Sequence, residues 1–153
     1  MKILPLKAIP EHIPEIARWV FNEWGHFDPT NSLDATISRL YARTNDDRLP
    51  IAFVAIDSSI PVGCVSIKFD DMKIRPNLNP WLGSLFVVPH MRKMGIGSAL
   101  VQRAIDFSVN SGILTIYLWT EVAVDFYKHF GFREKESVDY LNQHATIMER
   151  IAG

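Results

Sequence analysis

The chain has 153 residues, of which 48% are hydrophobic, 22% charged and 11% aromatic, and its formal net charge is −1. This length is typical of one domain, and the composition is that of a folded globular protein, which excludes wholesale disorder. With 16 Lys and Arg against 17 Asp and Glu, nothing attracts the chain to nucleic acid in general, and we expect no nucleic-acid partner.

The cysteine and apolar content bear on the compartment. Cys64 is the one cysteine, so no intrachain disulfide can form, which favours a reducing environment. No stretch approaches the ~18–20 apolar residues of a transmembrane helix, and Pro5, Lys7 and Pro10 interrupt any secretory signal. We therefore expect a cytoplasmic protein without a membrane partner. The histidines show no metal-ligand spacing, so no metal site is predicted.

Two amphipathic helices are predicted in the first third of the chain. Apolar residues recur with helical spacing over Ile13–Trp24, which predicts a helix with one buried face that ends at Gly25. Ser32 is a candidate N-cap, and Leu33–Tyr41 repeats the pattern as a second helix. An additional short strand fits the residues at Ile3–Lys7.

Three strands are predicted next. Ile51–Ile56 is a nearly continuous apolar run, typical of a strand covered on both faces. The turn residues Asp57–Ser59 join it to Val62–Phe69 as a hairpin. After a polar loop, Trp81–Val88 predicts a third strand that Pro89 ends.

The rest of the chain alternates between helices and strands. We expect a helix that begins near Gly95 and ends at Gly112, followed by a strand at Ile113–Trp119. A short helix comes next, with Val122, Phe126 and Phe130 on one side and Gly131 at its end. The last two expected strands are Phe132–Ser137 and Ala145–Ile151. There is no repeat or linker, so we expect one α+β domain over residues 1–153 with a mixed sheet.

The most informative segment joins the third strand to the following helix and reads Arg92-Lys93-Met94-Gly95-Ile96-Gly97-Ser98. Glycines allow positive φ and the close approach of a ligand, and the free N–H groups and dipole of a helix start favour an anion. The segment therefore predicts binding of a phosphate or pyrophosphate. A tight turn without a ligand is the alternative.

Two common nucleotide motifs do not fit this segment. The dinucleotide fingerprint requires a third glycine where Leu100 stands, and hairpin strands precede the loop instead of a βαβ unit. The Gly-Lys-Ser/Thr of a Walker motif is absent as well.

The run from Val87 to Leu100 resembles motif A of the GNAT (Gcn5-related N-acetyltransferase) superfamily, Gln/Arg-x-x-Gly-x-Gly/Ala, through Arg92, Gly95 and Gly97. Further along, Phe126-Tyr127-Lys128-His129-Phe130-Gly131-Phe132 resembles the family's second signature, aromatic-Tyr-x-x-hydrophobic-Gly-Phe. The order of elements is similar over nearly the full chain. The resemblance implies a GNAT-like mixed, mostly antiparallel central sheet flanked by helices, with two N-terminal helices.

The resemblance also implies an acetyl-CoA-dependent N-acetyltransferase, with acetyl-CoA as co-substrate. Main-chain N–H groups of the loop would hold the pyrophosphate, with Arg92 at the mouth; the residues concerned are Lys93, Met94, Gly95, Ile96, Gly97 and Ser98. The strand residues Leu85, Phe86 and Val87 would pair with the pantetheine arm and offer an N–H to the thioester carbonyl. Thr120 would take the place of the family's pantetheine-contacting Asn. Lys93 stands where the family usually has Gly.

The implied mechanism is direct attack by a neutral amine, with Tyr127 protonating the departing thiolate. A packed aromatic role is the alternative for Tyr127, and Cys64 is expected to be a buried thiol without a covalent role. The candidates for a general base are Glu121, Asp70, Asp71 and Glu23, each of which also fits a solvated surface carboxylate. None of them is singled out.

The acceptor is expected to be a small-molecule or peptide amine. Asn22-Glu23-Trp24 and the spacing from Trp119 to Tyr127 faintly resemble branches that act on protein N-termini and on aminoglycosides, which leaves a peptide, an antibiotic amine, a polyamine and a small metabolite as alternatives. Residues that could line its pocket are Trp24, His26, Arg75, Trp81, Trp119 and Tyr140, although core packing is an alternative for Trp24 and a surface role for His26. A non-catalytic acyl-CoA-binding or sensing module and a nucleotide-binding module are alternative functions. Two copies can pair through the final strands as a homodimer.

Overall fold

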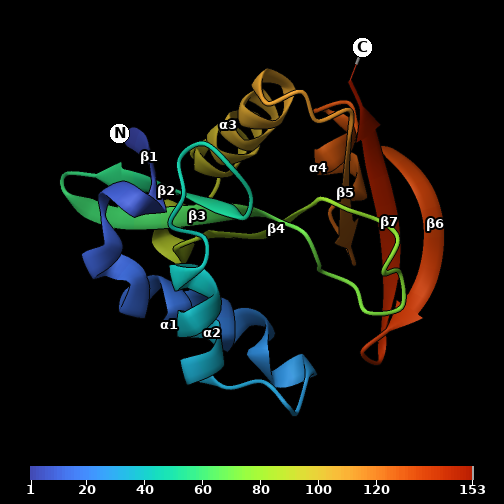
Figure 1. Cartoon of the computed structure of the whole chain (residues 1–153), viewed down its shortest axis with the longest axis horizontal. Coiled ribbons are helices and arrows are strands. Elements are labelled where there is room, and N and C mark those ends of the chain that lie inside the picture. The colour runs from blue at the N-terminus through green and yellow to red at the C-terminus, as the bar shows by residue number, and fades with distance from the viewer. Residues whose placement is uncertain (153) are drawn as a thin grey trace.

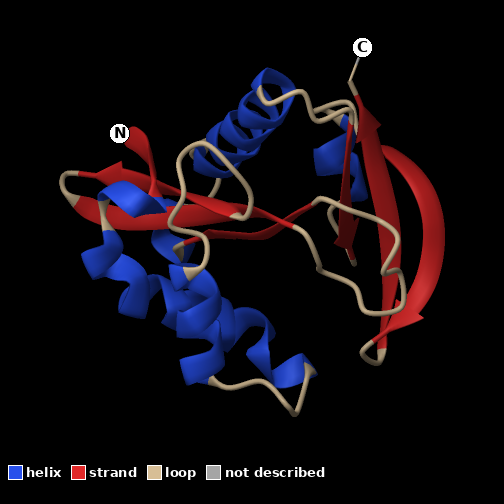
Figure 2. Ribbon diagram, viewed as in Figure 1, coloured by secondary structure: helices blue, strands red, loops and turns tan. Residues whose placement is uncertain are grey.

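The computed structural model describes residues 1–152, which build one seven-stranded sheet with helices on both faces (Figures 1 and 2). The strands are β1 (Lys2–Pro5), β2 (Ile51–Asp57), β3 (Ile60–Lys68), β4 (Trp81–Val87), β5 (Thr115–Thr120), β6 (Arg133–Tyr140) and β7 (Gln143–Ile151). The helices are α1 (Ile13–Trp24), α2 (Leu33–Tyr41), α3 (Ile96–Asn110) and α4 (Val124–Lys128), with 3₁₀ turns η1 (Leu6–Ala8), η2 (Pro10–His12), η3 (Gly25–Phe27) and η4 (Pro89–Met91).

The sheet has the spatial order β1-β2-β3-β4-β5-β7-β6, and only the β4–β5 pair is parallel among the described strands. This is the expected α+β class, with a mixed, mostly antiparallel sheet and two N-terminal helices, and that prediction is confirmed.

The two N-terminal helices cover one face of the first half of the sheet (Figure 2). Helix α1 has the predicted bounds, and α2 begins after Ser32, whose hydroxyl accepts a hydrogen bond from the Ala35 N–H at 3.0 Å. Their apolar stripes meet strand residues in one core cluster, which includes Leu6, Ile13, Ile16, Ala17, Leu40, Val54 and Cys64.

Helix α3 packs on the opposite face of the same strands (Figure 1). A Cβ atom on Gly63 of β3 would lie 2.9 Å from the Phe86 carbonyl oxygen and 3.0 Å from a Leu100 methyl carbon, so this glycine permits the close approach of α3. Leu100, Val101 and Ala104 of α3 are fully buried there. The helix start, and the loop before it, are thereby fixed at the end of β4.

Strand β4 contains a bulge. Phe86 pairs with Cys64 of β3 while Gly83 pairs with Ser66, so β4 has one residue more than β3 over this stretch. Ser84 lies in the extra stretch with φ 53°, in the left-handed region. Such bulges bend a strand and change the direction of its backbone groups.

Strands β4 and β5 diverge just beyond this point. Their register contains one pair, Trp81 with Tyr117, whereas β5 pairs with β7 over its whole length. In Figure 1 the two strands run apart from one another. Among residues 1–152, no strand pairs with the β5-facing edge of β4 after Trp81.

The predicted short helix differs from expectation at its start. Val122 was expected on its apolar face with Phe126 and Phe130, but the helix begins at Val124 and Val122 is 93% exposed. The Thr120 hydroxyl accepts a hydrogen bond from the Ala123 N–H at 3.0 Å, which makes a turn before the helix. The prediction for Val122 is therefore wrong. Phe126 and Phe130 do pack together, with ring centroids 5.3 Å apart.

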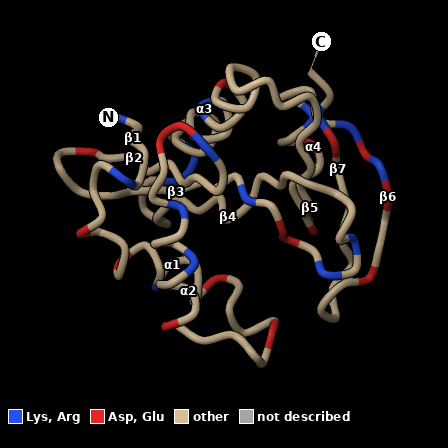
Figure 3. Tube along the Cα trace, viewed as in Figure 1, with Lys and Arg blue, Asp and Glu red and all other residues tan. Residues whose placement is uncertain are grey.

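The last strand in the spatial order, β6, is an exposed edge. Charged residues of both signs follow one another along it, as the blue and red segments of Figure 3 show. They are Arg133, Glu134, Lys135, Glu136 and Asp139. Charges on an edge strand discourage unwanted pairing with other strands.

Candidate functional site

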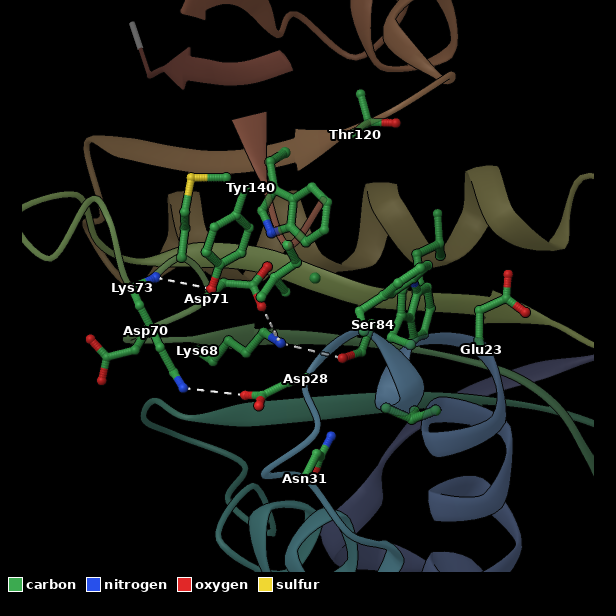
Figure 4. Close-up of a pocket in the computed structure, with 18 of the residues that line it drawn as sticks. Glu23, Asp28, Asn31, Lys68, Asp70, Asp71, Lys73, Ser84, Thr120 and Tyr140 are labelled. Atoms are coloured by element: carbon green, nitrogen blue, oxygen red, sulfur yellow. Dashed lines mark hydrogen bonds and ion pairs between the residues drawn. The ribbon is translucent and has the colours of Figure 1, made fainter. Parts of the chain in front are cut away.

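A cavity of about 880 Å³ opens where β4 and β5 diverge (Figure 4). Its walls come from α1, η3 and the loop after it, α2, the end of β3 and the loop that follows, the middle of β4, the end of β5, α4 and the β6–β7 turn. Segments far apart in the chain therefore meet at one opening. A second, smaller cavity of about 170 Å³ lies at the start of α3.

The smaller cavity is formed by the loop singled out in the sequence. Gly95 has φ 85°, which favours glycine, and α3 begins at the next residue. Within residues 1–152, no group accepts a hydrogen bond from the N–H groups of Ile96, Gly97 and Ser98. These N–H groups and the helix dipole favour an anion at this position. The cavity lining consists of Val87, Met91, Arg92, Lys93, Gly95, Ile96, Gly97, Ser98 and Phe126, whereas Met94 is exposed outside it.

The two basic residues of this loop have different surroundings. The Arg92 Nε donates a hydrogen bond to the Val87 carbonyl oxygen at 2.8 Å, and its guanidinium carbon lies 5.3 Å from the centre of the Phe86 ring. Arg92 therefore ties the loop to the end of β4. Lys93 is exposed and has φ 64°, in the region that glycine adopts most easily.

Strand β4 connects the two cavities. Leu85 lines the larger cavity, and Val87 lines the smaller one. Between them, Phe86 faces the N-terminal helices, where its ring stacks on Trp19 at 5.6 Å. The strand residues expected from the sequence thus lie together along one path from the larger cavity to the helix start.

Tyr127 of α4 reaches the larger cavity from the other side of the opening. Its side chain is 8% exposed and packs against the rings of Phe126 and Phe132. Burial raises the pKa of the Tyr127 hydroxyl to about 12, so this group keeps its proton at neutral pH. Among residues 1–152 the hydroxyl has no hydrogen-bond partner. Thr120 lines the same cavity, with its hydroxyl already accepting from Ala123.

Of the six residues considered for an acceptor pocket, Trp24, Trp119 and Tyr140 line the larger cavity. Trp119 has a buried indole N–H without a partner among the described residues, and its ring meets the Tyr140 ring edge-on at 5.7 Å.

The other three considered residues do not line the cavity, so placing them there is wrong. Trp81 is fully buried in the core, and its indole donates to the Leu78 carbonyl oxygen at 2.6 Å. The Arg75 side chain forms an ion pair with Glu136. His26 is exposed and packs against the Phe27 ring.

All four candidate bases, Glu23, Asp70, Asp71 and Glu121, line the larger cavity. Asp71 is ion-paired, since one of its oxygens lies 2.6 Å from the Lys68 Nζ. The Gln143 side-chain amide faces Glu121. Asp70 and Glu23 are exposed, and in Figure 4 the Asp70 carboxylate points away from Asp71.

Sequence reasoning missed the basic residues of the cavity wall, of which Arg43 and Lys68 are the least exposed. A signal for each was present. Arg43 follows Leu40 by three residues and so continues the apolar stripe of α2, and Lys68 alternates with Ser66 on one face of β3. Two exposed cations, Arg39 and Lys73, line the cavity as well. Lys73 lies 3.2 Å from Asp28, and hydrogen bonds from Thr30 together with Lys73 hold the Asp28 pKa at about 2.

A family model described as acetyltransferase (GNAT) family matches residues 13–132. A curated relative, an uncharacterized N-acetyltransferase of Methanocaldococcus jannaschii, is 43% identical over 58 residues, which are 35% of this chain and 26% of that protein. The match therefore spans about a quarter of the length of that relative.

Solved structures share the fold over the whole chain. One is a chain in the NatC complex bound to Gag peptide and CoA, which is 25% identical with a TM-score of 0.75, covering 100% of both chains. Another is an aminoglycoside 6'-N-acetyltransferase complexed with coenzyme A, 18% identical with a TM-score of 0.74, covering 99% of this chain and 97% of that one. None of the helices formed by residues 1–152 has the length and apolar character that a membrane crossing requires.

Proposed function

Because the chain belongs to the acetyltransferase (GNAT) family, we propose that it transfers an acetyl group from acetyl-CoA to a primary amine by direct attack of the amine on the thioester. The observation that carries this proposal is that β4 leads from one cavity to the other: Leu85 lines the cavity between β4 and β5, and Val87 lines the cavity at the start of α3. An extended arm that ends in a pyrophosphate fits such a path.

In this proposal the loop before α3 holds the pyrophosphate of the co-substrate. The N–H groups of Ile96, Gly97 and Ser98 have no other partner among the described residues, and the left-handed Gly95 brings the backbone close to a ligand. Lys93 adds positive charge, while Arg92 holds the loop against β4. The open edge of β4 over Leu85, Phe86 and Val87 accommodates an extended arm as if it were an additional strand.

Acetyl-CoA supplies an acyl group that is already activated as a thioester. The backbone N–H of Leu85, beside the β4 bulge, is proposed to bind the carbonyl oxygen and to stabilise the negative charge that develops there. The amine nitrogen forms a bond to the carbonyl carbon, the carbon–sulfur bond breaks, and the nitrogen loses one proton to a base or to water. No protein atom is acetylated on the way, and the Cys64 thiol is buried and donates to the Ser84 carbonyl oxygen at 3.4 Å.

Tyr127 is proposed to donate its proton to the leaving sulfur. Its hydroxyl is free of partners within residues 1–152, borders the cavity that Leu85 also lines, and remains protonated because burial raises its pKa to about 12. Thr120, at the same opening, is proposed to contact the pantetheine arm. The acceptor amine enters from the larger cavity, as a small molecule or a peptide end.

The first test is a thermal melt with acetyl-CoA, CoA, ATP and NAD in parallel. A ligand at ~100 times its dissociation constant stabilises the native state by ~2.7 kcal/mol, which corresponds to an increase in Tm on the order of 5–10 °C for a chain of this size. We expect the increase with acetyl-CoA and CoA alone, followed by CoA release when amines are added. An increase with ATP or NAD only would contradict the proposal, and CoA binding without transfer to any amine would indicate a sensing module.

A further inference from the structure

The wall of the larger cavity contains a buried cation that forms no ion pair within residues 1–152 and feels the Asp71 carboxylate only at a distance. Arg43 follows α2 and is only 6% exposed, and its guanidinium lines the cavity. Its side chain forms one hydrogen bond, from Nη1 to the Ser66 hydroxyl at 3.0 Å. Within residues 1–152 it takes part in no ion pair. Most of the donors of this guanidinium are therefore unused.

A second cation lies on the same face of the sheet. The Lys68 side chain is 15% exposed, and its Nζ lies 2.6 Å from an Asp71 oxygen and 3.4 Å from the Ser84 hydroxyl. Burial lowers the pKa of Lys68; Asp71 opposes this change and Arg43 adds to it. Figure 4 shows Lys68 between Asp71 and Ser84. Two buried cations thus share one nearby carboxylate.

This arrangement favours an anionic ligand. A buried charge without a partner is strongly unfavourable, and an added carboxylate would supply the missing negative charge. The planar guanidinium of an arginine can bind a carboxylate with two parallel hydrogen bonds. The exposed acids of the cavity, Glu23, Asp70 and Glu121, provide the opposite charge elsewhere in the same space.

The two cations Arg43 and Lys68, together called the cationic wall, have a definite position relative to the proposed reaction centre. Lys68 contacts Ser84, and Ser84 directly precedes Leu85, whose N–H was proposed to bind the thioester carbonyl. The cationic wall is therefore adjacent to the proposed reaction centre. A ligand anion on this wall would lie within a few bonds of an amine that attacks there.

We infer that the acceptor is a primary amine that carries a carboxylate within a few bonds of its nitrogen, and that Arg43, assisted by Lys68, binds this carboxylate. The inference rests on the proposed function and specifies its acceptor. The carboxylate belongs to a free amino acid or to an acidic side chain at a peptide N-terminus. A polycationic amine would meet repulsion from Arg43 and Lys68.

The experiment compares matched acceptors in which an amide replaces the carboxylate, with kcat/KM referred to the neutral amine because amidation also lowers the pKa of the α-amine. CoA release is measured with amino acids and their carboxamides, and with dipeptide amides that begin with Asp or with Asn. The carboxylate member of the productive pair is expected to have a kcat/KM about 10- to 100-fold higher. If the free amino acids react faster than their carboxamides, the acceptor is a free amino acid. If only the dipeptide amides that begin with Asp react faster than those that begin with Asn, the acceptor is an acidic peptide N-terminus. Equal rates within every pair would overturn the inference and leave the proposed function intact.

Variants then assign the preference to the wall. Arg43→Gln is expected to remove the preference through a higher KM, and Arg43→Lys, which retains the charge for folding, to reduce it. The control is Arg103→Gln, whose guanidinium covers the Phe53 ring at 4.5 Å on the α3 side. An equal loss for both members of a pair would contradict the assignment.

A binding measurement separates the two proposals. The same acids and carboxamides are titrated calorimetrically into the protein saturated with CoA. Selective binding of the acids without transfer would support the carboxylate site and overturn the transferase. Transfer to the carboxamides alone would support the transferase and overturn the carboxylate site. If no acid is bound and none is acetylated, the inference is overturned as well.

Discussion

A Cβ atom on Gly83 would lie 2.8 Å from the Cε atom of Lys68. The same Cβ would lie 3.0 Å from an Asp71 oxygen, so the ion pair of Lys68 and Asp71 rests on the bare backbone of β4. Gly83 faces the larger cavity one residue before the bulge at Ser84. Because Gly83 has no side chain, the Lys68 ammonium and the Asp71 carboxylate can lie directly over the β4 backbone.

Gly83→Ala is therefore expected to displace the Lys68 side chain and lower the free energy of unfolding by about 1–3 kcal/mol through overpacking. The KM for the acceptor should rise by about tenfold, because its carboxylate loses a charge-assisted hydrogen bond from Lys68. The dissociation constant of CoA should not change, since Gly83 does not line the smaller cavity. Steady-state kinetics with varied acceptor, together with a CoA titration, measures both. Weaker CoA binding with an unchanged acceptor KM would refute this explanation.

Gly95→Ala is expected to weaken CoA binding by about tenfold or more, because φ 85° is unfavourable for alanine and the loop must shift. Gly112→Ala is a matched control. Gly112 has φ 77°, and at both glycines an added Cβ meets nothing within 4 Å. Both variants should lower the free energy of unfolding by about 1–2 kcal/mol. Only the first should change the CoA titration, and equal CoA affinity in the two variants would remove the loop from the donor site.

Tyr127→Phe retains the buried ring and removes the proton that was proposed for the leaving sulfur. We expect kcat to fall by about 10²-fold or more, with the CoA dissociation constant unchanged. Tyr117→Phe, on β5 outside the cavity lining, serves as the control and should retain full turnover. If Tyr127→Phe turns over at the wild-type rate, another group or water protonates the thiolate.

The pKa of Tyr127 also predicts how stability depends on pH. The pKa is raised to about 12 in the native state by burial, whereas an unfolded tyrosine has a pKa of about 10. Below about pH 10 both states hold the proton, and this group contributes no pH dependence. Between about pH 10 and 12 only the unfolded state releases it, so the free energy of unfolding falls as pH rises, by up to ~1.4 kcal/mol per pH unit. Urea unfolding of the wild type and Tyr127→Phe should diverge in that range alone.

Cys64 is expected to be dispensable for turnover. Burial raises the pKa of its thiol to about 12, and the side chain is enclosed between the sheet and the N-terminal helices. Cys64→Ala should retain kcat while it lowers stability by about 1–2 kcal/mol. A thiol reagent should label the wild type only after denaturation. Loss of kcat in a folded Cys64→Ala variant would argue for a covalent intermediate and against direct attack.

Local sequence patterns predicted the elements whose packing is simple. The stripe over Ile13–Trp24 has one buried face, and the helix has the predicted bounds. The pattern is less informative where a turn interrupts it, because Val122 has helical spacing to Phe126 but precedes a turn held by Thr120. The spacing of apolar residues cannot predict a turn that depends on a side-chain hydrogen bond.

The candidate site shows a similar division. The loop from Arg92 to Ser98 could be predicted because all its groups are neighbours in the chain, and the structure brings most of them to one small cavity. The cationic wall could not be predicted in the same way, since Arg43 and Lys68 are separated in the chain and meet only through packing of α2 on β3. Arg75 was misplaced for the same reason, because its partner Glu136 comes from a distant strand.

The single rung between Trp81 and Tyr117 leaves two half-sheets that are joined at one point. In heavy water, amides along the open edge of β4 should exchange quickly in the free protein and slowly once the arm of the co-substrate lies beside them. The protection would follow one side of one strand. Under the proposed function, the arm of the acetyl donor therefore occupies the position of a strand beside β4 while it is bound, and the gap between the two half-sheets opens again when CoA leaves.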